Sequence, residues 1–250
     1  MATVSTPHRA SVVEGGVVYK QNLSEFVQED QKVFFGATDR NKEAILEKLR
    51  PFLNEARLVL EVGSGSGQHL YHFSKDYPEV TFQPSEYDTS LFHSINAYAM
   101  ELPGHLIKRP LELDATNRDH WSTVLHAGHE EESYGPASGN GVYDLVLTTN
   151  VFHISAWVVG QSIVRGAGQV LKPGGHFILY GAFKRNGKFS TPSNEQFDQT
   201  LRGRDASWGV RDIEAIEEVA RKEAQMELKN VIDMPSNNYM LIFQKVELEE

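Results

Sequence analysis

Three glycines at alternate positions are the first sign of chemistry in the sequence. Gly63, Gly65 and Gly67 follow the apolar run at 58–62 and precede a stretch whose apolar residues have helical spacing. Glycine lets the backbone turn sharply and lets a ligand approach without meeting a Cβ atom, and the helix start adds free N–H groups. The pattern predicts a ligand-binding turn, although a tight strand-to-helix connection would use the same glycines.

Two other ligand classes are disfavoured by neighbouring residues. A nicotinamide dinucleotide site would have its third glycine at position 68, where this chain has Gln68. His69 and His72 are three residues apart on the expected helix, but no carboxylate pattern accompanies them, so we interpret them as solvated or packing residues. The chain has no cysteine, which excludes thiolate-ligated metals and a thiol nucleophile. We therefore predict no metal.

The composition limits which partners the protein is expected to bind and where in the cell it is expected to be. The chain has 250 residues, of which 40% are apolar, and a formal charge of -10, which opposes a polyanionic partner such as nucleic acid. Without a long apolar run or a secretory signal, a cytoplasmic protein without membrane contact is expected. Residues 1–16 are expected to be a disordered leader, and 17–250 a single domain with a mobile insertion at 127–141.

Apolar runs alternate with helical patterns along the chain, which predicts an α/β fold with a mostly parallel, twisted sheet and helices on both faces. The first helix is expected to be capped by Asp39 and to end before Pro51. Strands are expected at 58–62, 80–82, 105–113 and 143–149, with a fifth after Pro173.

The last third of the sequence has a different character. The 25 residues after Phe183 are polar, with glycines and a proline, and are expected to form a long irregular lid. A helix follows with apolar residues at Val210, Ile213 and Ile216. Two strand-like segments, 228–234 and 238–246, are expected to pair as a C-terminal antiparallel hairpin.

The glycine turn resembles motif I of class I S-adenosylmethionine-dependent methyltransferases. The spacing is G-x-G-x-G, and Glu61 lies two residues upstream of the first glycine. The resemblance implies a Rossmann-like fold and S-adenosyl-L-methionine as cofactor. It also implies that Glu61, Ser64 and the three glycines line the cofactor site.

The same resemblance assigns residues at the ends of the following strands. An acid after the second strand would accept both ribose hydroxyls; Glu86 is favoured for this role and Asp88 for a helix cap. Asp114, followed by Ala115, would meet the adenine amino group, or cap the next helix, or do both. Asn150 ends the fourth strand, as in many small-molecule methyltransferases.

Several polar, irregular segments are similar to an incompletely characterised methyltransferase-like family that was first catalogued as a domain of unknown function. The similarity covers about residues 39–246. The shared segments are Arg40-Asn41-Lys42, EVGSGSGQH, FQPSE, Tyr180-Gly181, NGKFSTPSNEQFDQTLR, WGVRD at 208–212 and DMPSNN at 233–238. For the substrate this resemblance implies little.

Candidates for binding and activating an acceptor lie beyond the fourth and fifth strands. His153 is the expected general base, with a packing or capping role as the alternative. The remaining candidates are polar or aromatic side chains that offer an acceptor pocket, or alternatively a helix start, a packed indole and an ion pair. They are Asn194, Asp198, Trp208 and Arg211.

Three functional hypotheses follow. The favoured one is a methyltransferase that acts on a small molecule by in-line transfer, consistent with the acidic charge. The alternatives are a protein or peptide methyltransferase and a non-catalytic, cofactor-binding regulatory protein. The sequence indicates neither the methylated atom nor the oligomeric state.

Overall fold

The computed structural model describes residues 31–129 and 141–246. The expected leader at 1–16 lies outside these ranges. Most of the expected insertion at 127–141 also lies outside them, but its first residues are helical, since helix α4 spans Arg118–His129.

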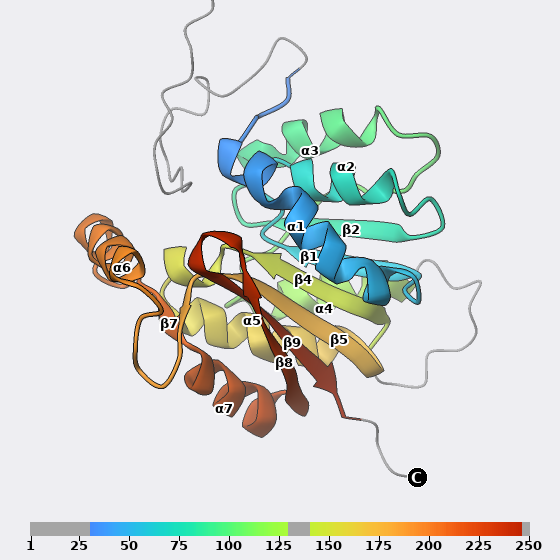
Figure 1. Ribbon diagram of the computed structural model, residues 1–250. Coiled ribbons are helices and arrows are strands. Elements are labelled where there is room, and N and C mark those ends of the chain that lie inside the picture. Colours follow the sequence, from blue (N-terminus) through green and yellow to red (C-terminus); the bar gives the residue numbers. More distant parts are fainter. Residues whose placement is uncertain (1–30, 130–140, 247–250) are drawn as a thin grey trace, which may run out of the picture.

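A seven-stranded sheet forms the centre of the described structure, in the order β3-β2-β1-β4-β5-β9-β8 (Figure 1). The first five strands in chain order pair in parallel, β9 is antiparallel to β5, and β8 and β9 form an antiparallel hairpin. This confirms the predicted α/β fold with its mostly parallel sheet and C-terminal hairpin. The strands are β1 (Leu58–Val62), β2 (Thr81–Glu86), β3 (Leu111–Glu112), β4 (Tyr143–Thr149), β5 (Leu171–Gly181), β8 (Met226–Met234) and β9 (Asn238–Lys245).

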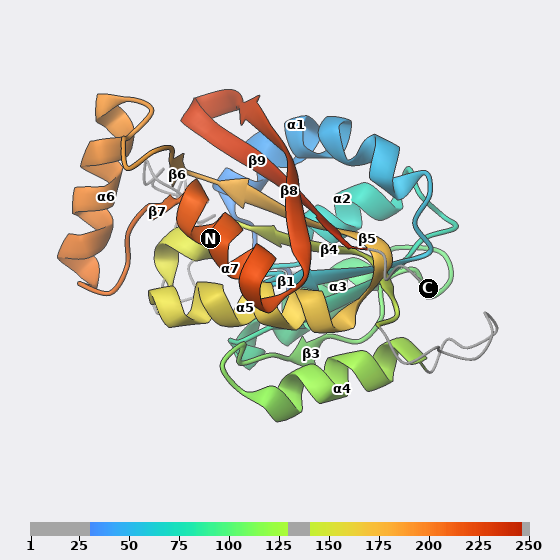
Figure 2. The ribbon, with the colours of Figure 1, turned by 90° about the horizontal axis from the view of Figure 1, so that it is seen from below.

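Helices cover both faces of this sheet, as predicted (Figures 1 and 2). One apolar core joins a face of the sheet to α1 (Gly36–Leu53), α2 (Gln68–Ser74) and α3 (Phe92–Ala99). The other core joins the opposite face to α4, α5 (Trp157–Val170) and α7 (Ile213–Glu223).

Strand β1 shows how the sheet directs its side chains. Leu58, Leu60 and Val62 belong to the core under α4, α5 and α7, whereas Val59 belongs to the core under α1 and α2. Successive strand residues point to opposite faces, so Glu61 points with Val59 toward α1 and α2. The only acid of this buried strand is thereby turned toward the helix that follows the glycine turn.

The expected boundaries of several elements in the first half are wrong. Helix α1 begins at Gly36 instead of being capped by Asp39, and it continues through Pro51 to Leu53. Proline removes one helical hydrogen bond, but the burial of Leu53 holds the last turn in place. The strand expected over 105–113 is reduced to β3 and an isolated bridge at Ile107, because Pro110 has no N–H to donate.

The segment after Phe183 is not the long irregular lid that was expected. It forms β6 (Phe183–Lys184), helix α6 (Pro192–Arg204) and β7 (Arg211–Asp212), which pairs with β6. The helix begins where Thr191 accepts a hydrogen bond from the Asn194 N–H and Pro192 occupies the first turn. Figure 1 shows α6 set apart from the helices on the two sheet faces.

Candidate functional site

The glycine turn connects β1 to α2 at the carboxyl end of the sheet. All three glycines have positive φ, between 55° and 90°, a region that favours glycine. A Cβ atom on Gly63 would lie 2.5 Å from Val151 Cγ2, and one on Gly67 would lie 3.0 Å from Ile95 Cα. Any other residue would strain the turn, so Gly63, Gly65 and Gly67 fit the predicted approach of backbone to ligand.

Glu86 ends β2 beside this turn. Its Oε2 accepts a hydrogen bond from the Gly65 N–H at 2.8 Å, and its Oε1 accepts from the N–H groups of Tyr87 and Asp88 at 2.8 and 3.0 Å. Burial raises the pKa of Glu86, and the three backbone donors counteract that shift. The carboxylate is thus held against the glycine loop with its position set by backbone.

Asp88 has a different role. Its Oδ1 accepts hydrogen bonds from the Ser90 N–H and hydroxyl and caps the short helix η2 (Thr89–Leu91). The predicted cap at Asp88 is confirmed, and the division of roles between Glu86 and Asp88 is consistent with this geometry.

Glu61 is buried at the end of β1, and among the described residues neither of its carboxylate oxygens has a hydrogen-bond partner. Burial raises its pKa to about 8. The neighbouring hydroxyl of Ser64 lies 3.4 Å from the Glu61 carbonyl oxygen, and its closeness to the carboxyl group partly opposes the rise in pKa. A buried acid without a partner is costly, which makes Glu61 a candidate for binding a ligand group.

His69 is a member of this site that the sequence analysis missed. It is buried in α2, its Nδ1 lies 3.8 Å from Glu61 Oε1, and its Nε2 lies 2.8 Å from Asn41 Oδ1. The sequence signal that indicates His69 is the alternation of side chains along β1, which turns Glu61 toward the first helical turn after the glycines. His72 instead faces Glu43 at 3.3 Å and is separate from this group.

The ends of β3 and β4 supply the remaining expected cofactor residues. Asp114 accepts hydrogen bonds from the Thr116 N–H and hydroxyl, so it holds the turn into α4. The carbonyl of Ala115 accepts from the Trp121 indole at 2.9 Å. Asn150 has a φ of 61° and donates its N–H to the Tyr180 carbonyl, which fixes the bend after β4.

His153 lies in the short helix η3 (Phe152–Ile154), just beyond Asn150. The ring is 3% exposed, packs edge-on against Phe197 at 5.1 Å, and has no partner at Nδ1 within the described ranges. A Cβ atom on Gly181 would lie 3.4 Å from this Nδ1 and 3.5 Å from Asn150 Oδ1. Burial lowers the pKa of His153 to about 4, with a smaller contribution from the charge of Arg211. The imidazole is therefore neutral at pH 7, which leaves one ring nitrogen able to accept a hydrogen bond, but the same burial makes it a weaker base than a free histidine.

Two of the expected acceptor residues support the backbone around His153. Asp198 is buried; its Oδ1 accepts from the Val210 N–H at 2.7 Å, and its Oδ2 accepts from Arg202 Nε at 2.7 Å. Arg211 donates to the carbonyls of Phe152 and Ser155 at the two ends of η3. Both side chains are thus engaged inside the protein.

The other two expected acceptor residues are also packed. Trp208 belongs to a small apolar cluster around Leu201 and Val210. Asn194 Nδ2 donates to the Ser190 hydroxyl at 2.8 Å and to the Asn237 carbonyl at 2.9 Å. All four expected acceptor residues are thus held by contacts within the protein.

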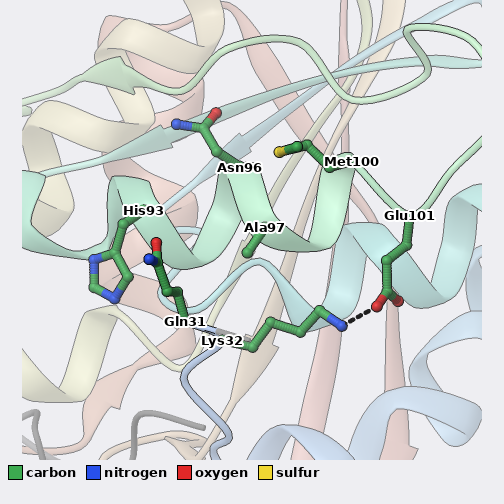
Figure 3. Close-up of a pocket in the computed structure, with 7 residues that line it drawn as sticks. All are labelled: Gln31, Lys32, His93, Asn96, Ala97, Met100 and Glu101. Atoms are coloured by element: carbon green, nitrogen blue, oxygen red, sulfur yellow. Dashed lines mark hydrogen bonds and ion pairs between the residues drawn. The ribbon is translucent and has the colours of Figure 1, made fainter. Parts of the chain in front are cut away.

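A surface groove of about 480 Å³ lies elsewhere, along α3 (Figure 3). None of the predicted site residues lines it, and a Lys32–Glu101 ion pair crosses one side. Its lining is Gln31, Lys32, His93, Asn96, Ala97, Met100 and Glu101. In the two described ranges, no helix is long and apolar enough to cross a membrane, and no group of three His, Asp or Glu side chains could hold a metal.

Solved methyltransferases share this fold at low sequence identity. An O-methyltransferase family protein from Burkholderia thailandensis matches with a TM-score of 0.61 and 16% identity, over 90% of this chain and 63% of that chain. Human N-acetylserotonin methyltransferase, in complex with SAM, matches with a TM-score of 0.59 and 12% identity, over 84% and 53%. The calicheamicin-biosynthesis methyltransferase CalO1, in its SAH-bound form, gives 0.60 and 15%, over 84% and 54%. The match thus spans less than two thirds of the length of each of these proteins.

These similarities show the class I methyltransferase fold. A family described as "Protein of unknown function (DUF938)" matches residues 32–245. That range includes every predicted site residue, from Glu61 to Arg211. The chain belongs to the DUF938 family.

Proposed function

We propose that this protein is an S-adenosylmethionine-dependent methyltransferase that acts on a small-molecule acceptor. The observation that carries the proposal is the glycine turn with a carboxylate on each side, the buried Glu61 at the end of β1 and the half-buried Glu86 at the end of β2. Ligands of open α/β sheets bind at the carboxyl ends of the strands, where both acids lie.

The polar groups of this edge fit S-adenosylmethionine one by one. The unpartnered, buried carboxyl of Glu61 suits the ammonium group of the methionine end. Glu86 is held beside the Gly65 N–H, where a carboxylate can accept from both ribose hydroxyls. Asp114 follows β3, the strand next to β2, and is the candidate partner of the adenine amino group. Ser64, Ala115 and Asn150 complete the expected lining.

When bound, S-adenosylmethionine supplies a methyl group that is already activated on a sulfonium, so the protein needs chiefly to position the acceptor and exclude water. His153 is the one predicted catalytic residue. Its neutral ring, with Nδ1 turned toward the bend at Asn150 and Gly181, can take the proton of an acceptor hydroxyl.

A calorimetric titration of the purified chain with S-adenosylmethionine, S-adenosylhomocysteine and NADH tests the cofactor. We expect both sulfur ligands to bind and NADH not to bind. A folded protein that binds neither sulfur ligand would contradict the proposal, and tighter binding of NADH would replace it with a nicotinamide enzyme.

A screen of small hydroxyl and amine acceptors by mass spectrometry tests the transfer. With an acceptor that the screen shows to be methylated, His153→Gln should lower kcat by about 10²-fold with little change in KM or in cofactor affinity. The matched control is His72→Gln in α2, where the ring faces Glu43, and it should leave both constants unchanged.

A non-catalytic, cofactor-binding role is the second candidate, and one observation favours it. Asn194, Asp198, Trp208 and Arg211 are all engaged in contacts within the protein, which leaves fewer of their polar groups free for an acceptor. Cofactor binding without a methylated product across small-molecule, peptide and protein acceptors would select this role.

A further inference from the structure

A chain of polar side chains crosses the helix-covered face of the sheet and ends at Glu61. Asn238 Nδ2 at the start of β9 donates to the Tyr180 hydroxyl at 3.0 Å, and Asn41 in α1 also hydrogen-bonds that hydroxyl. Asn41 Oδ1 then lies 2.8 Å from His69 Nε2, and His69 Nδ1 faces Glu61 Oε1 at 3.8 Å. Five elements thus contribute to one chain, which is half-buried at Asn238 and Asn41 and buried at His69 and Glu61.

The donors and acceptors in this chain determine where the hydrogens lie. Asn41 Oδ1 can only accept, so His69 Nε2 must carry a hydrogen. In a neutral imidazole, Nδ1 then has a lone pair, and this lone pair faces Glu61. An ionised Glu61 would face that lone pair without a proton between them, which is unfavourable in a buried site.

The surrounding charges favour placing this proton on Glu61. Burial is the main reason that the pKa of His69 falls to about 3, and the charges of His72 on α2 and Lys42 on α1 add to it. Burial also raises the pKa of Glu61 to about 8; Ser64 opposes the shift and the charge of Glu86 on β2 adds to it. Both side chains are therefore neutral at pH 7, with the acidic hydrogen on Glu61.

We propose that Asn41 and His69 are positioning residues that hold Glu61 as a neutral acid, and that the ammonium group of the cofactor displaces the Glu61 proton when it binds. This inference rests on the proposed function. One proton leaves the Glu61 carboxyl for solvent, the ammonium N–H groups take its place at the carboxylate, and no covalent bond of the ligand changes.

Proton release makes affinity depend on pH in a defined direction. Below pH 8, each bound ligand should release about one proton, so Kd should fall about tenfold per pH unit as pH rises. Calorimetric titration of the full chain with S-adenosylhomocysteine at pH 6 and pH 7, each in two buffers of different ionisation enthalpy, measures both quantities.

Three variants separate this role from a structural one. Glu61→Gln has no proton to release, so its binding should be weak and independent of pH. Asn41→Ala frees the His69 tautomer, which lets Nδ1–H donate to an ionised Glu61, so proton release should fall well below one and the pH dependence should flatten. His126→Gln, an exposed histidine of α4 on the opposite face of the sheet, is the control and should release the same number of protons as the wild type. Circular dichroism confirms that each variant is folded.

The outcomes distinguish this inference from the proposed function. Tight binding of S-adenosylhomocysteine without proton release would overturn the inference and leave the proposed function standing. Wild-type proton release by Asn41→Ala would overturn the positioning role, as would loss of release in the control His126→Gln. A folded wild type that binds no sulfur ligand would instead contradict the proposed function itself.

Discussion

Glu61 and Asp198 are both buried carboxylates, but their surroundings differ in the hydrogen bonds that they offer to a buried acid. Asp198, on α6, accepts hydrogen bonds from the Val210 N–H and from Arg202. Glu61, at the end of β1, has two buried oxygens that accept no hydrogen bond within normal distance in the described part of the chain, although Ser64 lies close enough to lower its pKa. A satisfied acid stabilises its surroundings, whereas an unsatisfied one costs stability. We therefore interpret the α6 region as scaffold and the β1–β2 edge as the binding region.

His153 shares one structural feature with each of these two regions. Its ring nitrogen Nδ1 is unpartnered among the described residues, as Glu61 is, but its backbone is held by the scaffold. The Gly209 N–H donates to the His153 carbonyl, and Arg211 donates to the carbonyls on either side of the ring's helix. The residues expected to bind the acceptor thus fix the position of the expected base.

Glu61→Gln should show the largest effect. This effect concerns the stability of the protein and not its activity. The pKa of Glu61 is raised in the folded protein, so its stabilising contribution is present below the unfolded value near 4.5 and is lost as pH rises through about 8. Relative to the wild type, the ligand-free variant should gain about 4 kcal/mol between pH 4.5 and pH 8. Urea unfolding of both proteins at several pH values measures this difference.

Taking the difference between variant and wild type cancels the opposite contribution of His69 and His153. Their lowered pKa values make both proteins lose stability as pH falls below 6.5. A pH-independent difference between the two proteins would mean that Glu61 is ionised in the folded state, and the contrast with Asp198 would disappear.

Asp198→Ala should cost about 3 kcal/mol of unfolding free energy, because it leaves the buried Val210 N–H without an acceptor. Asp198→Asn is the matched variant: it keeps one acceptor oxygen and should lose only about 1 kcal/mol. Urea unfolding measures both. Cofactor affinity should be unchanged in each, and a parallel loss of affinity would show that the scaffold region belongs to the cofactor site.

The binding region could be predicted from sequence because its residues directly follow strands. A buried apolar run predicts a strand, and the turn residues after it must lie at the carboxyl edge of a parallel sheet. The glycine turn at Gly63 is predicted in this way, whereas Glu86 and Asn150 are assigned through the resemblance to class I methyltransferases. The helix-start pattern at Asp88 distinguishes this cap from Glu86.

The scaffold region could not be predicted in the same way. Asp198 pairs with a backbone N–H twelve residues away, in a segment whose polarity indicated an irregular lid, while Thr191 and Pro192 in fact start a helix. The approach of Asn41 to His69 was also hidden, because it depends on how α1 packs across the sheet and not on local spacing.

Glu86→Gln tests the other acid of the binding region. The amide places a donor group where three backbone N–H groups now point and removes the acceptor pair for the ribose. Affinity for S-adenosylhomocysteine should fall by 10- to 100-fold, or about 1.4–2.8 kcal/mol, by calorimetric titration. Asp88→Asn keeps a capping oxygen and should bind normally; equal losses in the two variants would remove the distinction between ribose acceptor and cap.

Phe35→Ala should show the smallest effect, on the rate of cofactor exchange. The Phe35 ring lies against Gly65, since a Cβ atom on this glycine would be 3.6 Å from the ring. The Phe35 N–H also donates to Gln68 Oε1 at 2.6 Å. This aromatic ring covers the glycine turn, so its removal should speed dissociation of S-adenosylhomocysteine about fivefold in stopped-flow measurements, or about 1 kcal/mol.

Phe34→Ala is the matched control, because Phe34 is the neighbouring ring and is 39% exposed. It should leave the dissociation rate unchanged. If both substitutions speed dissociation equally, the effect belongs to the chain segment before α1 and not to the ring that contacts the turn. If neither does, the contact of Phe35 with Gly65 is scaffold packing, and the boundary between the two regions moves to the other side of the glycine turn, where Val151 and Ile95 pack against Gly63 and Gly67.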